Sequence, residues 1–224
     1  MPMKQLFTLL LVSLTVHSGA QQVPPSPSQE RWDQRYDRAA YIYGEEPVEF
    51  LRQQVHTLGT GKALSLAAGE GRNAVFLAQQ GFAVVAVDIS PKGLEKCRQL
   101  ASQKQVEIET VVADLDTYDM GQEQYDLITD FYYHDPSLFT KIIRALKPGG
   151  KLILQNFSVE QPATSRFGPR NPAYLVKPNE LLAHFADYRI RYYQDTVVEL
   201  DEGMHQGPGA VVRLIVEKTP VVND

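Results

Sequence analysis

The stretch Leu64–Ala74, which reads LSLAAGEGRNA, leads an apolar run directly into Gly69-Glu70-Gly71 and then into a helical pattern. A strand, a tight glycine turn and a helix in this order begin a nucleotide-binding unit, because the turn lets the backbone approach a ligand closely. A second apolar run, 82–88, follows the helix and ends in the carboxylate of Asp88. The spacing G-x-G-x-x-A with this acid satisfies the dinucleotide fingerprint, but it also fits a ligand that needs no phosphate site.

Around this turn, apolar strands alternate with amphipathic helices, which predicts a mainly parallel sheet with helices on both faces. The stretch Ser158–Pro178 has no periodicity and is rich in Pro and Arg, so we expect a lid or binding loop there. The last two strands are joined by so short a connection that they must pair antiparallel. The predicted strands are 62–68, 82–88, 106–114, 125–133, 151–157, 188–200 and 210–218, and the predicted helices are 72–80, one beginning at Ser90-Pro91, 137–146 and 180–185.

The composition limits the partners and the cofactors. A chain of 224 residues suits one well-buried domain. The formal charge of -5 and the pI of about 5.6 give no polycationic surface, so nucleic acid and acidic membranes are not expected partners. Cys97 is the single cysteine, which excludes an internal disulfide and a cysteine metal cluster. No His, Asp and Glu spacing suggests a metal site, and Cys97 is expected to be buried on its helix.

The N-terminus has the pattern of a secretory signal. Met1–Lys4 is a short positive region, 6–16 is apolar, and Ser18-Gly19-Ala20 is a small-residue cleavage site. The apolar run is shorter than the roughly 20 residues of a membrane span, so we expect export and no stable span after cleavage. The protein is cytoplasmic if the signal does not function. The expected organisation is a signal peptide at 1–20, a flexible leader at 21–29 and one domain at 30–219.

The second half of the sequence indicates which of the two kinds of ligand, a dinucleotide or a ligand without a phosphate site, the glycine turn holds. A dinucleotide enzyme needs a further mononucleotide-binding unit, and little chain remains for one. Instead the sequence ALKPGGKLILQ at 145–155 precedes the terminal antiparallel pair. This half resembles class I S-adenosylmethionine (SAM)-dependent methyltransferases. The resemblance implies a Rossmann-like, doubly wound α/β sheet of seven strands, mostly parallel with a C-terminal antiparallel strand.

Four segments make the resemblance closer. They are RWDQRYDRAAYIYGEEPVEFL at 31–51, GEGRNAVFLAQQGFAVVAVDIS at 69–90, LDEGMHQG at 200–207 and AVVRLIVEK at 210–218. They are similar to the small bacterial group related to tellurite-resistance and thiopurine methyltransferases. The similarity covers nearly everything after the leader, and it is the combination of motifs that is specific.

The resemblance implies a cofactor site for SAM. The glycine turn surrounds the methionine part, the acid after the second strand holds the ribose, the next residue and the pair after the third strand contact the adenine, and N-terminal aromatic residues close over the ligand. The implied cofactor-binding residues are Trp32, Tyr36, Tyr43, Gly44, Gly69, Glu70, Gly71, Asp88, Ile89, Asp114 and Leu115.

Some of these residues also have a purely structural interpretation. Trp32 and Tyr36 could form a hydrophobic staple, and Asp114 could be a turn former. Asp88 is different, because a carboxylate that ends a buried strand is costly unless something hydrogen-bonds to it.

The chain departs from the family pattern in the strand before the turn. Ser65 and Ala67 replace the usual acid and first glycine, and Ala68 stands where close relatives often carry Glu. Backbone carbonyls and aromatic rings would then hold the cationic groups of the ligand, and a cation over a ring gains about 0.5–2 kcal/mol.

Methyl transfer is an in-line displacement, so it depends mainly on alignment in a dry site and needs a base only for a protonated nucleophile. His134 and Tyr133 follow the fourth strand, at the edge where an acceptor would approach, and are the predicted catalytic residues. His205 and Arg166 are secondary candidates. As alternatives, His134 could be a capping or otherwise satisfied polar residue before the next helix, and His205 could lie on the surface.

The resemblance therefore implies a SAM-dependent methyltransferase that acts on a small-molecule acceptor, and we expect a soft nucleophile such as a thiol or another chalcogen. Two alternatives remain open. One is an exported SAM-fold binding protein without catalysis, and the other is a small NAD-binding reductase. The reductase has the glycine match but no catalytic Ser, Tyr and Lys spacing in this sequence.

Overall fold

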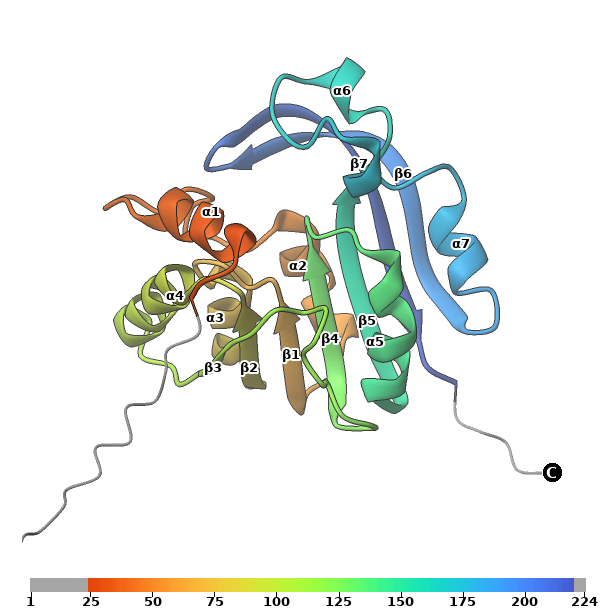
Figure 1. Ribbon diagram of the computed structural model, residues 1–224. Coiled ribbons are helices and arrows are strands. Elements are labelled where there is room, and N and C mark those ends of the chain that lie inside the picture. Colours follow the sequence, from red (N-terminus) through yellow and green to blue (C-terminus); the bar gives the residue numbers. More distant parts are fainter. Residues whose placement is uncertain (1–23, 220–224) are drawn as a thin grey trace, which may run out of the picture.

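Residues 24–219, which the computed structural model describes, contain a seven-stranded sheet in the order β3-β2-β1-β4-β5-β7-β6 (Figure 1). The strands are β1 (Lys62–Leu66), β2 (Ala83–Asp88), β3 (Glu109–Val112), β4 (Tyr125–Phe131), β5 (Leu146–Phe157), β6 (Arg189–Glu202) and β7 (His205–Glu217). The helices are α1 (Pro27–Tyr36), α2 (Glu49–Gln54), α3 (Arg72–Gln79), α4 (Pro91–Gln103), α5 (Phe139–Ala145), α6 (Gln161–Thr164) and α7 (Glu180–His184), with short 3-10 helices η1 (Val55–Thr57), η2 (Pro136–Leu138) and η3 (Pro172–Tyr174).

The pairing confirms the predicted fold class. β3, β2, β1, β4 and β5 pair parallel, in registers such as Leu64↔Val85 and Leu66↔Asp130. β7 pairs antiparallel with both β5 and β6. All strands except β7 therefore point their carboxyl ends toward the same edge of the sheet.

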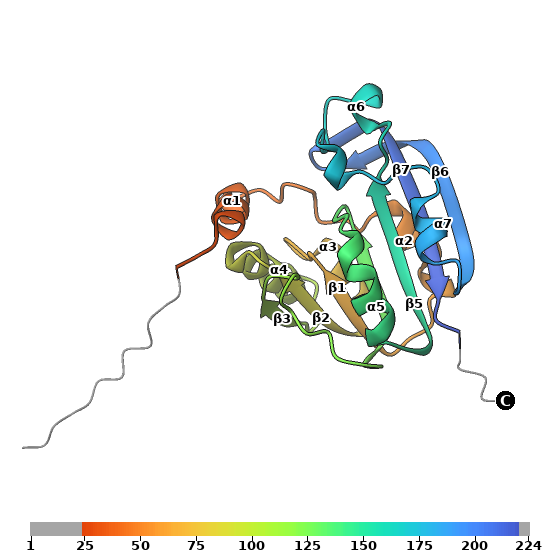
Figure 2. The same ribbon diagram turned by 45° about the vertical axis from the view of Figure 1, so that its right-hand side comes forward.

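Helices cover both faces of the sheet (Figures 1 and 2). On one face, Ile142 of α5 and Leu181 of α7 pack with buried side chains of β1, β2, β5 and β7. On the other face, Phe50, Leu77 and Leu94 from α2, α3 and α4 form a second core cluster. The continuous apolar run of β2 is buried on both sides, as the sequence predicts for a central parallel strand.

The N-terminal helix begins inside the segment that we expected to be a flexible leader. The Ser26 hydroxyl accepts a hydrogen bond from the Gln29 amide, and Pro27 occupies the first helical position. Both features start helices, so 27–29 belong to α1. The expected signal peptide lies outside the described residues. Among 24–219, none of the helices combines the length and the apolar character that crossing a bilayer requires.

Two boundaries differ from the sequence prediction. Lys147–Gly150, which we expected to be a turn before the fifth strand, is part of β5, with an irregular register opposite Tyr125 and Leu127. The predicted nine-residue connection 201–209 is mostly strand, because Glu202 pairs directly with His205. The resulting long hairpin bends over the upper edge of the sheet toward α1 (Figure 1).

Candidate functional site

The glycine turn between β1 and α3 lies at the carboxyl edge of the sheet. Ala67, Gly69 and Gly71 all have positive φ, at 44°, 53° and 90°. A Cβ on Gly71 would lie 2.7 Å from the Cβ of Cys97, so this glycine lets α4 approach the turn. A Cβ on Gly69 would lie 2.6 Å from the Tyr36 hydroxyl. The two glycines therefore allow close contacts to α4 and α1.

Asp88 joins the turn to the start of α4. One carboxylate oxygen accepts from the Gly69 amide at 2.7 Å, and the other accepts from the Ser90 amide at 2.8 Å. Burial raises the pKa of Asp88 to about 6, although these amides favour the charged form and Asp33 opposes it. The buried carboxylate thus has the hydrogen bonds that the sequence analysis expects. It is ionised above about pH 6, and it has lone pairs left for a ligand.

Trp32 and Tyr36 come from α1 and cover the turn. The Tyr36 ring is buried between Gly69 and Gly93, and it stacks with Trp32 at a centroid distance of 5.6 Å. The Asp33 carboxylate accepts from the Ser90 hydroxyl at 2.5 Å, which ties α1 to α4. These contacts bring both aromatic residues to the Asp88 region.

The side chain of Glu70 holds the N-terminal segment 40–44, which we call the strap. Its carboxylate lies 2.5 Å from the Lys96 ammonium and accepts from the Ile42 amide at 2.8 Å. The same ammonium donates to the Ala40 carbonyl at 2.7 Å. Glu70 therefore fixes the strap, and only its backbone remains for the ligand contact that the resemblance implies.

A second buried ion pair anchors Tyr43 and Gly44 from the other side. The Arg72 guanidinium donates to Glu202 at 2.8 Å and to the Tyr43 carbonyl at 2.8 Å. At the tip of the β6–β7 hairpin, the Met204 amide donates to the Ile42 carbonyl at 2.9 Å. The strap is thus held between the glycine turn and the hairpin.

Ile89, Asp114 and Leu115 lie at the ends of β2 and β3. Ile89 is half-buried and Leu115 is buried in the core cluster beneath α5. The Asp114 carboxylate accepts from the Asp116 amide at 3.1 Å, which is the turn-forming contact that the sequence offered as its alternative. The Ala113 amide donates to the Asp88 carbonyl and places this turn beside Asp88.

His134 and Tyr133 occupy the connection between β4 and η2. His134 is buried, with Nε2 3.5 Å from Glu180 of α7, and within the described part of the chain its Nδ1 has no hydrogen-bond partner. Burial lowers the pKa of His134, although Glu180 opposes this, and burial raises the pKa of Tyr133 above its usual range. The cap of η2 is Asp135, whose carboxylate accepts from the Ser137 amide at 2.9 Å. The capping interpretation of His134 is therefore wrong.

His205 is buried, so the surface interpretation is also wrong. It lies at the start of β7 among aromatic rings that include Tyr43 of the strap and Tyr132 after β4. Arg166, by contrast, is exposed on the lid segment.

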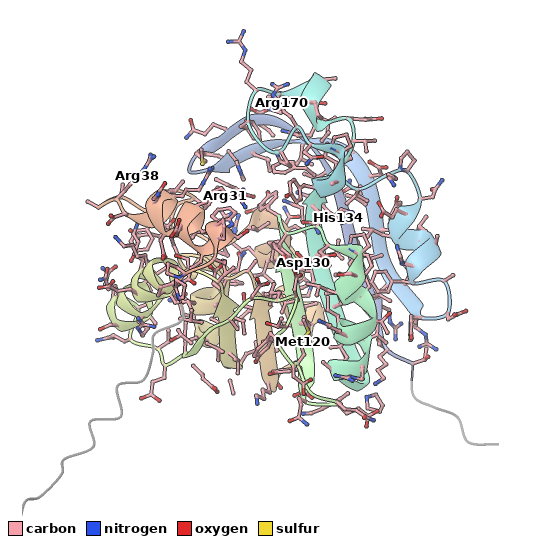
Figure 3. The ribbon with its side chains drawn as sticks, in the orientation of Figure 1. Arg31, Arg38, Met120, Asp130, His134 and Arg170 are labelled. Carbon is pink, nitrogen blue, oxygen red and sulfur yellow. The ribbon has the colours of Figure 1, made fainter. Side chains whose placement is uncertain are left out.

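Asp130 and Asn156 are buried at the carboxyl ends of β4 and β5, and the sequence prediction missed them. Burial raises the pKa of Asp130 to about 7, although the Asn156 amide favours its charged form. Asp130 lies beside Leu66 of β1, and its Oδ1 has no hydrogen-bond partner. In Figure 3 it lies with His134 above Met120, toward the edge that carries the strap. The argument used for Asp88, a carboxylate ending a buried strand, would have found it.

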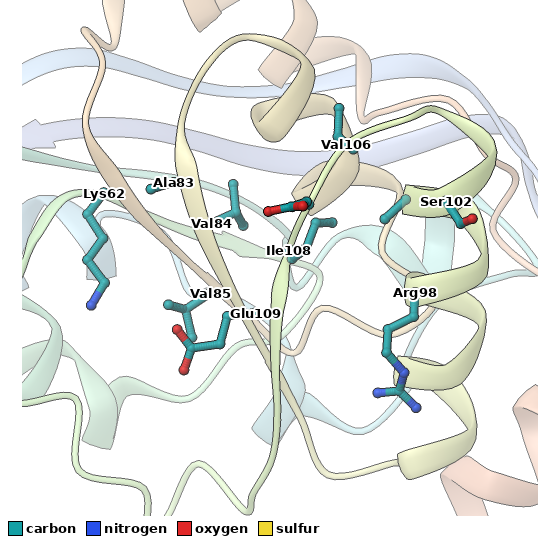
Figure 4. Close-up of a pocket in the computed structure, with 11 residues that line it drawn as sticks. Lys62, Ala83, Val84, Val85, Arg98, Ser102, Val106, Ile108 and Glu109 are labelled. Carbon is teal, nitrogen blue, oxygen red and sulfur yellow. The ribbon is translucent and has the colours of Figure 1, made fainter.

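A hollow of about 770 Å³ lies at the opposite edge (Figure 4). Its lining includes Lys62 and Ala83, the first residues of β1 and β2, together with Arg98 and Glu109. Ligands of open α/β sheets bind at the carboxyl ends of the strands, so this hollow is not the cofactor site. Among residues 24–219, no three His, Cys, Asp or Glu side chains gather as metal ligands would.

Comparison with known proteins matches residues 63–150 to the family described as a methyltransferase domain. Hemagglutinin 1 from Eikenella corrodens is 28% identical over 155 residues, which are 66% of this chain and 50% of that protein. The uncharacterized methyltransferase sll0829 from Synechocystis sp. (strain ATCC 27184 / PCC 6803 / Kazusa) is 31% identical over 136 residues, 57% of this chain and 61% of that protein. The match thus spans about half to three fifths of the length of these relatives.

Solved structures with the same fold include methyltransferases. TehB from Haemophilus influenzae superposes with a TM-score of 0.64 at 18% identity, over 85% of this chain and 67% of that one. The geranyl diphosphate C-methyltransferase from Streptomyces coelicolor A3(2), solved with S-adenosyl-L-homocysteine (SAH), Mg²⁺ and geranyl diphosphate, has a TM-score of 0.64 at 14% identity, over 88% and 100% of the two chains. Residues 63–150 therefore match the methyltransferase-domain family, and residues 24–219 have the same seven-stranded fold as these solved structures.

Proposed function

We propose that this protein transfers a methyl group from SAM to a small-molecule acceptor. The observation that best supports this is the buried carboxylate of Asp88, which binds the Gly69 amide directly below the aromatic cover of α1. In a dinucleotide site, the second glycine leaves room for a pyrophosphate. Here Gly71 instead accommodates Cys97 of α4, which favours a ligand without phosphates.

The chain's own residues supply alignment and exclusion of water, while bound SAM supplies an electrophilic methyl group. Asp88 would accept hydrogen bonds from the ribose, and the strap with α1 would close over the ligand. The rings of Trp32 and Tyr43 already lie 5.6 Å from the Arg35 guanidinium, so this surface tolerates a cation over its faces.

His134, with Tyr133 beside it, is our candidate for handling the acceptor's proton. Glu180 holds one ring nitrogen, and Nδ1 is free to accept. This arrangement follows the logic of a base oriented by a carboxylate. In the reaction the acceptor gives its proton to a base, an electron pair of the acceptor forms the bond to the methyl carbon, and SAH leaves.

The variant His134→Gln tests this role. If His134 is the base, turnover falls about 10²–10⁴-fold while SAH affinity stays nearly constant. His184→Gln is the matched control, because His184 also lies against Phe139 but is exposed. Normal turnover in a destabilised His134→Gln protein would make His134 structural.

We further propose that the acceptor is a soft nucleophile, a thiol or a related chalcogen, which rests on the resemblance described above. Formation of SAH from SAM with thiols, amines and catechols as acceptors tests this. Transfer to thiols is expected. Preference for the amine or the catechol would contradict the acceptor class, and SAH binding without any turnover would favour a binding protein.

We also propose that the protein is exported and cleaved after Ala20, on the pattern of the first twenty residues. N-terminal sequencing of the protein from fractionated cells tests this. A chain that keeps Met1 and stays in the cytosol would contradict export.

A further inference from the structure

Four aromatic rings surround His205 at the carboxyl edge of the sheet. Its ring centroid lies 5.0 Å from Tyr43, 5.1 Å from Tyr132, 5.3 Å from Phe157 and 5.4 Å from Phe167. The strap, the ends of β4 and β5, and the lid each contribute one ring. We call this group the ring cage.

His205 has a buried polar atom that its surroundings leave unsatisfied. The residue is 6% exposed, and its Nδ1 makes no hydrogen bond to any of residues 24–219. Burial, together with the nearby charges of Arg72 and Arg35, lowers its pKa to about 4. His205 is therefore neutral at physiological pH, and an unpaired buried nitrogen costs stability unless a ligand uses it.

Glu202 and Arg72, the charged groups beneath Tyr132 of the ring cage, are already paired with each other. Glu202 accepts from Arg72 at 2.8 Å and from the Tyr132 hydroxyl at 2.9 Å, and Gln155 donates to that hydroxyl at 2.5 Å. Arg35 lies over the ring of Tyr43, 5.6 Å from its centroid, and contacts Met204. The cage itself offers a ligand four aromatic rings and a neutral imidazole, so a charged group enclosed by them would lose its hydration.

Phe167 closes the cage from the lid. Its ring is half-exposed and lies nearly parallel to the imidazole, with an interplanar angle of 25°. The buried Gln161 side chain holds this position, since it donates to the Phe167 carbonyl at 3.0 Å and accepts from the Ala210 amide at 2.7 Å. Gln161 thus anchors the lid to β7, and the ring of Phe167 covers His205.

We propose that His205 contacts the methyl acceptor through Nδ1, and that the ring cage selects acceptors with an uncharged, apolar body. Phe167 moves aside when the acceptor enters and then packs against it. This proposal rests on the methyl transfer proposed above. It adds a residue from β7 to the acceptor side, distinct from His134 after β4.

The test measures SAH formation at pH 7 with three thiols of similar size: 1-butanethiol, 3-mercaptopropionate and cysteamine. The proposal predicts a KM for 1-butanethiol at least about tenfold below those of the anionic and cationic thiols, the free-energy equivalent of one hydrogen bond to a charged group. Equal KM values, or a preference for a charged thiol, would overturn it.

The variant His205→Phe separates a binding role from a packing role. A phenyl ring keeps the stacking but has no Nδ1, so the KM for 1-butanethiol should rise about 2- to 13-fold with unchanged SAH affinity. Phe167→Ala should raise the same KM, while Tyr174→Ala, on an exposed lid residue, should not. An altered melting temperature with an unchanged KM in His205→Phe would make His205 structural.

The outcomes distinguish this proposal from the proposed function. Absence of SAH binding to the wild-type protein would contradict SAM-dependent methyl transfer itself. SAH binding with no transfer to any of the three thiols would contradict the thiol acceptor of the proposed function. Transfer to all three thiols with equal KM values would overturn the role of the ring cage alone.

Discussion

Ala67 lies in the glycine turn of the candidate site and has a strained backbone conformation. It stands where the family has a glycine, and its φ of 44° lies in the left-handed region. This conformation costs an L-residue roughly 1–2 kcal/mol, whereas glycine adopts it freely. The turn therefore needs a left-handed conformation at a position where this chain has alanine instead of glycine.

We expect Ala67→Gly to stabilise the protein by up to about 1.5 kcal/mol, because the relief of strain exceeds the entropy of a more flexible unfolded chain. The measurement is urea denaturation at neutral pH. Ala68→Gly is the control, since Ala68 is not among the residues with positive φ, and it should destabilise by about 0.4–1 kcal/mol. Two variants with the same sign would contradict the strain.

Asp130 should make stability depend on pH. Its pKa is raised by burial to about 7, so between about pH 4 and pH 7 the folded state binds more protons than the unfolded state. Its contribution is therefore present at low pH and is lost as the pH rises through this window. Asp130→Asn cannot titrate and does not show this loss. As the pH rises from 4.5 to 7, its free energy of unfolding minus that of the wild type should therefore increase by about 1 kcal/mol per pH unit.

Denaturation at several pH values measures this difference. The pH dependence of stability that Asp126 causes should have the opposite sign, so Asp126→Asn serves as the comparison. Burial raises the pKa of Asp126, but Lys147 and the Lys62 amide lower it overall. A stability difference between Asp130→Asn and wild type that does not change with pH would contradict a buried carboxyl with a raised pKa.

At the scale of elements, the strap is the segment on which the closed site depends. Its buried ion pairs join segments far apart in sequence, such as Arg72 and Glu202. Lys96→Met would leave Glu70 buried without its cation, and breaking a buried pair in this way costs about 3–5 kcal/mol. The strap would also lose the hydrogen bond at Ala40, so SAH affinity should fall.

Arg144→Met is the matched control for Lys96→Met. Arg144 pairs with Asp119 on the surface, where the two side chains are 56% and 78% exposed. Such a pair contributes about 0–1 kcal/mol. Unfolding by denaturant should therefore separate the two variants clearly, and equally small losses in both would show that the strap does not depend on Glu70.

At the scale of the whole molecule, the order and direction of the elements followed from local sequence patterns. Apolar runs predicted the strands, and the short terminal connection predicted the antiparallel pair. The contacts that complete the site were harder to predict, because Arg72–Glu202 and His205 with Phe167 join distant segments and leave no periodic signal. The contacts of the Glu70 side chain could not be predicted either, because the glycine motif implies a role only for the Glu70 backbone.

Asp88 is the residue whose removal should affect the cofactor most. Asp88→Ala removes the charged acceptor of the Gly69 amide and, on the proposed function, that of the ribose. A charged hydrogen bond contributes about 1.5–3 kcal/mol, so SAH affinity should fall at least about tenfold at pH 7.5. Unchanged affinity would remove Asp88 from the site.

The central claim is that this edge of the sheet binds SAM and not a dinucleotide. Calorimetric titration of the purified wild-type protein with SAH and, separately, with NAD tests it most directly. We predict saturable binding of SAH at one site per chain and no comparable heat with NAD. Preferential binding of NAD, or no binding of SAH to a folded protein, would contradict the account.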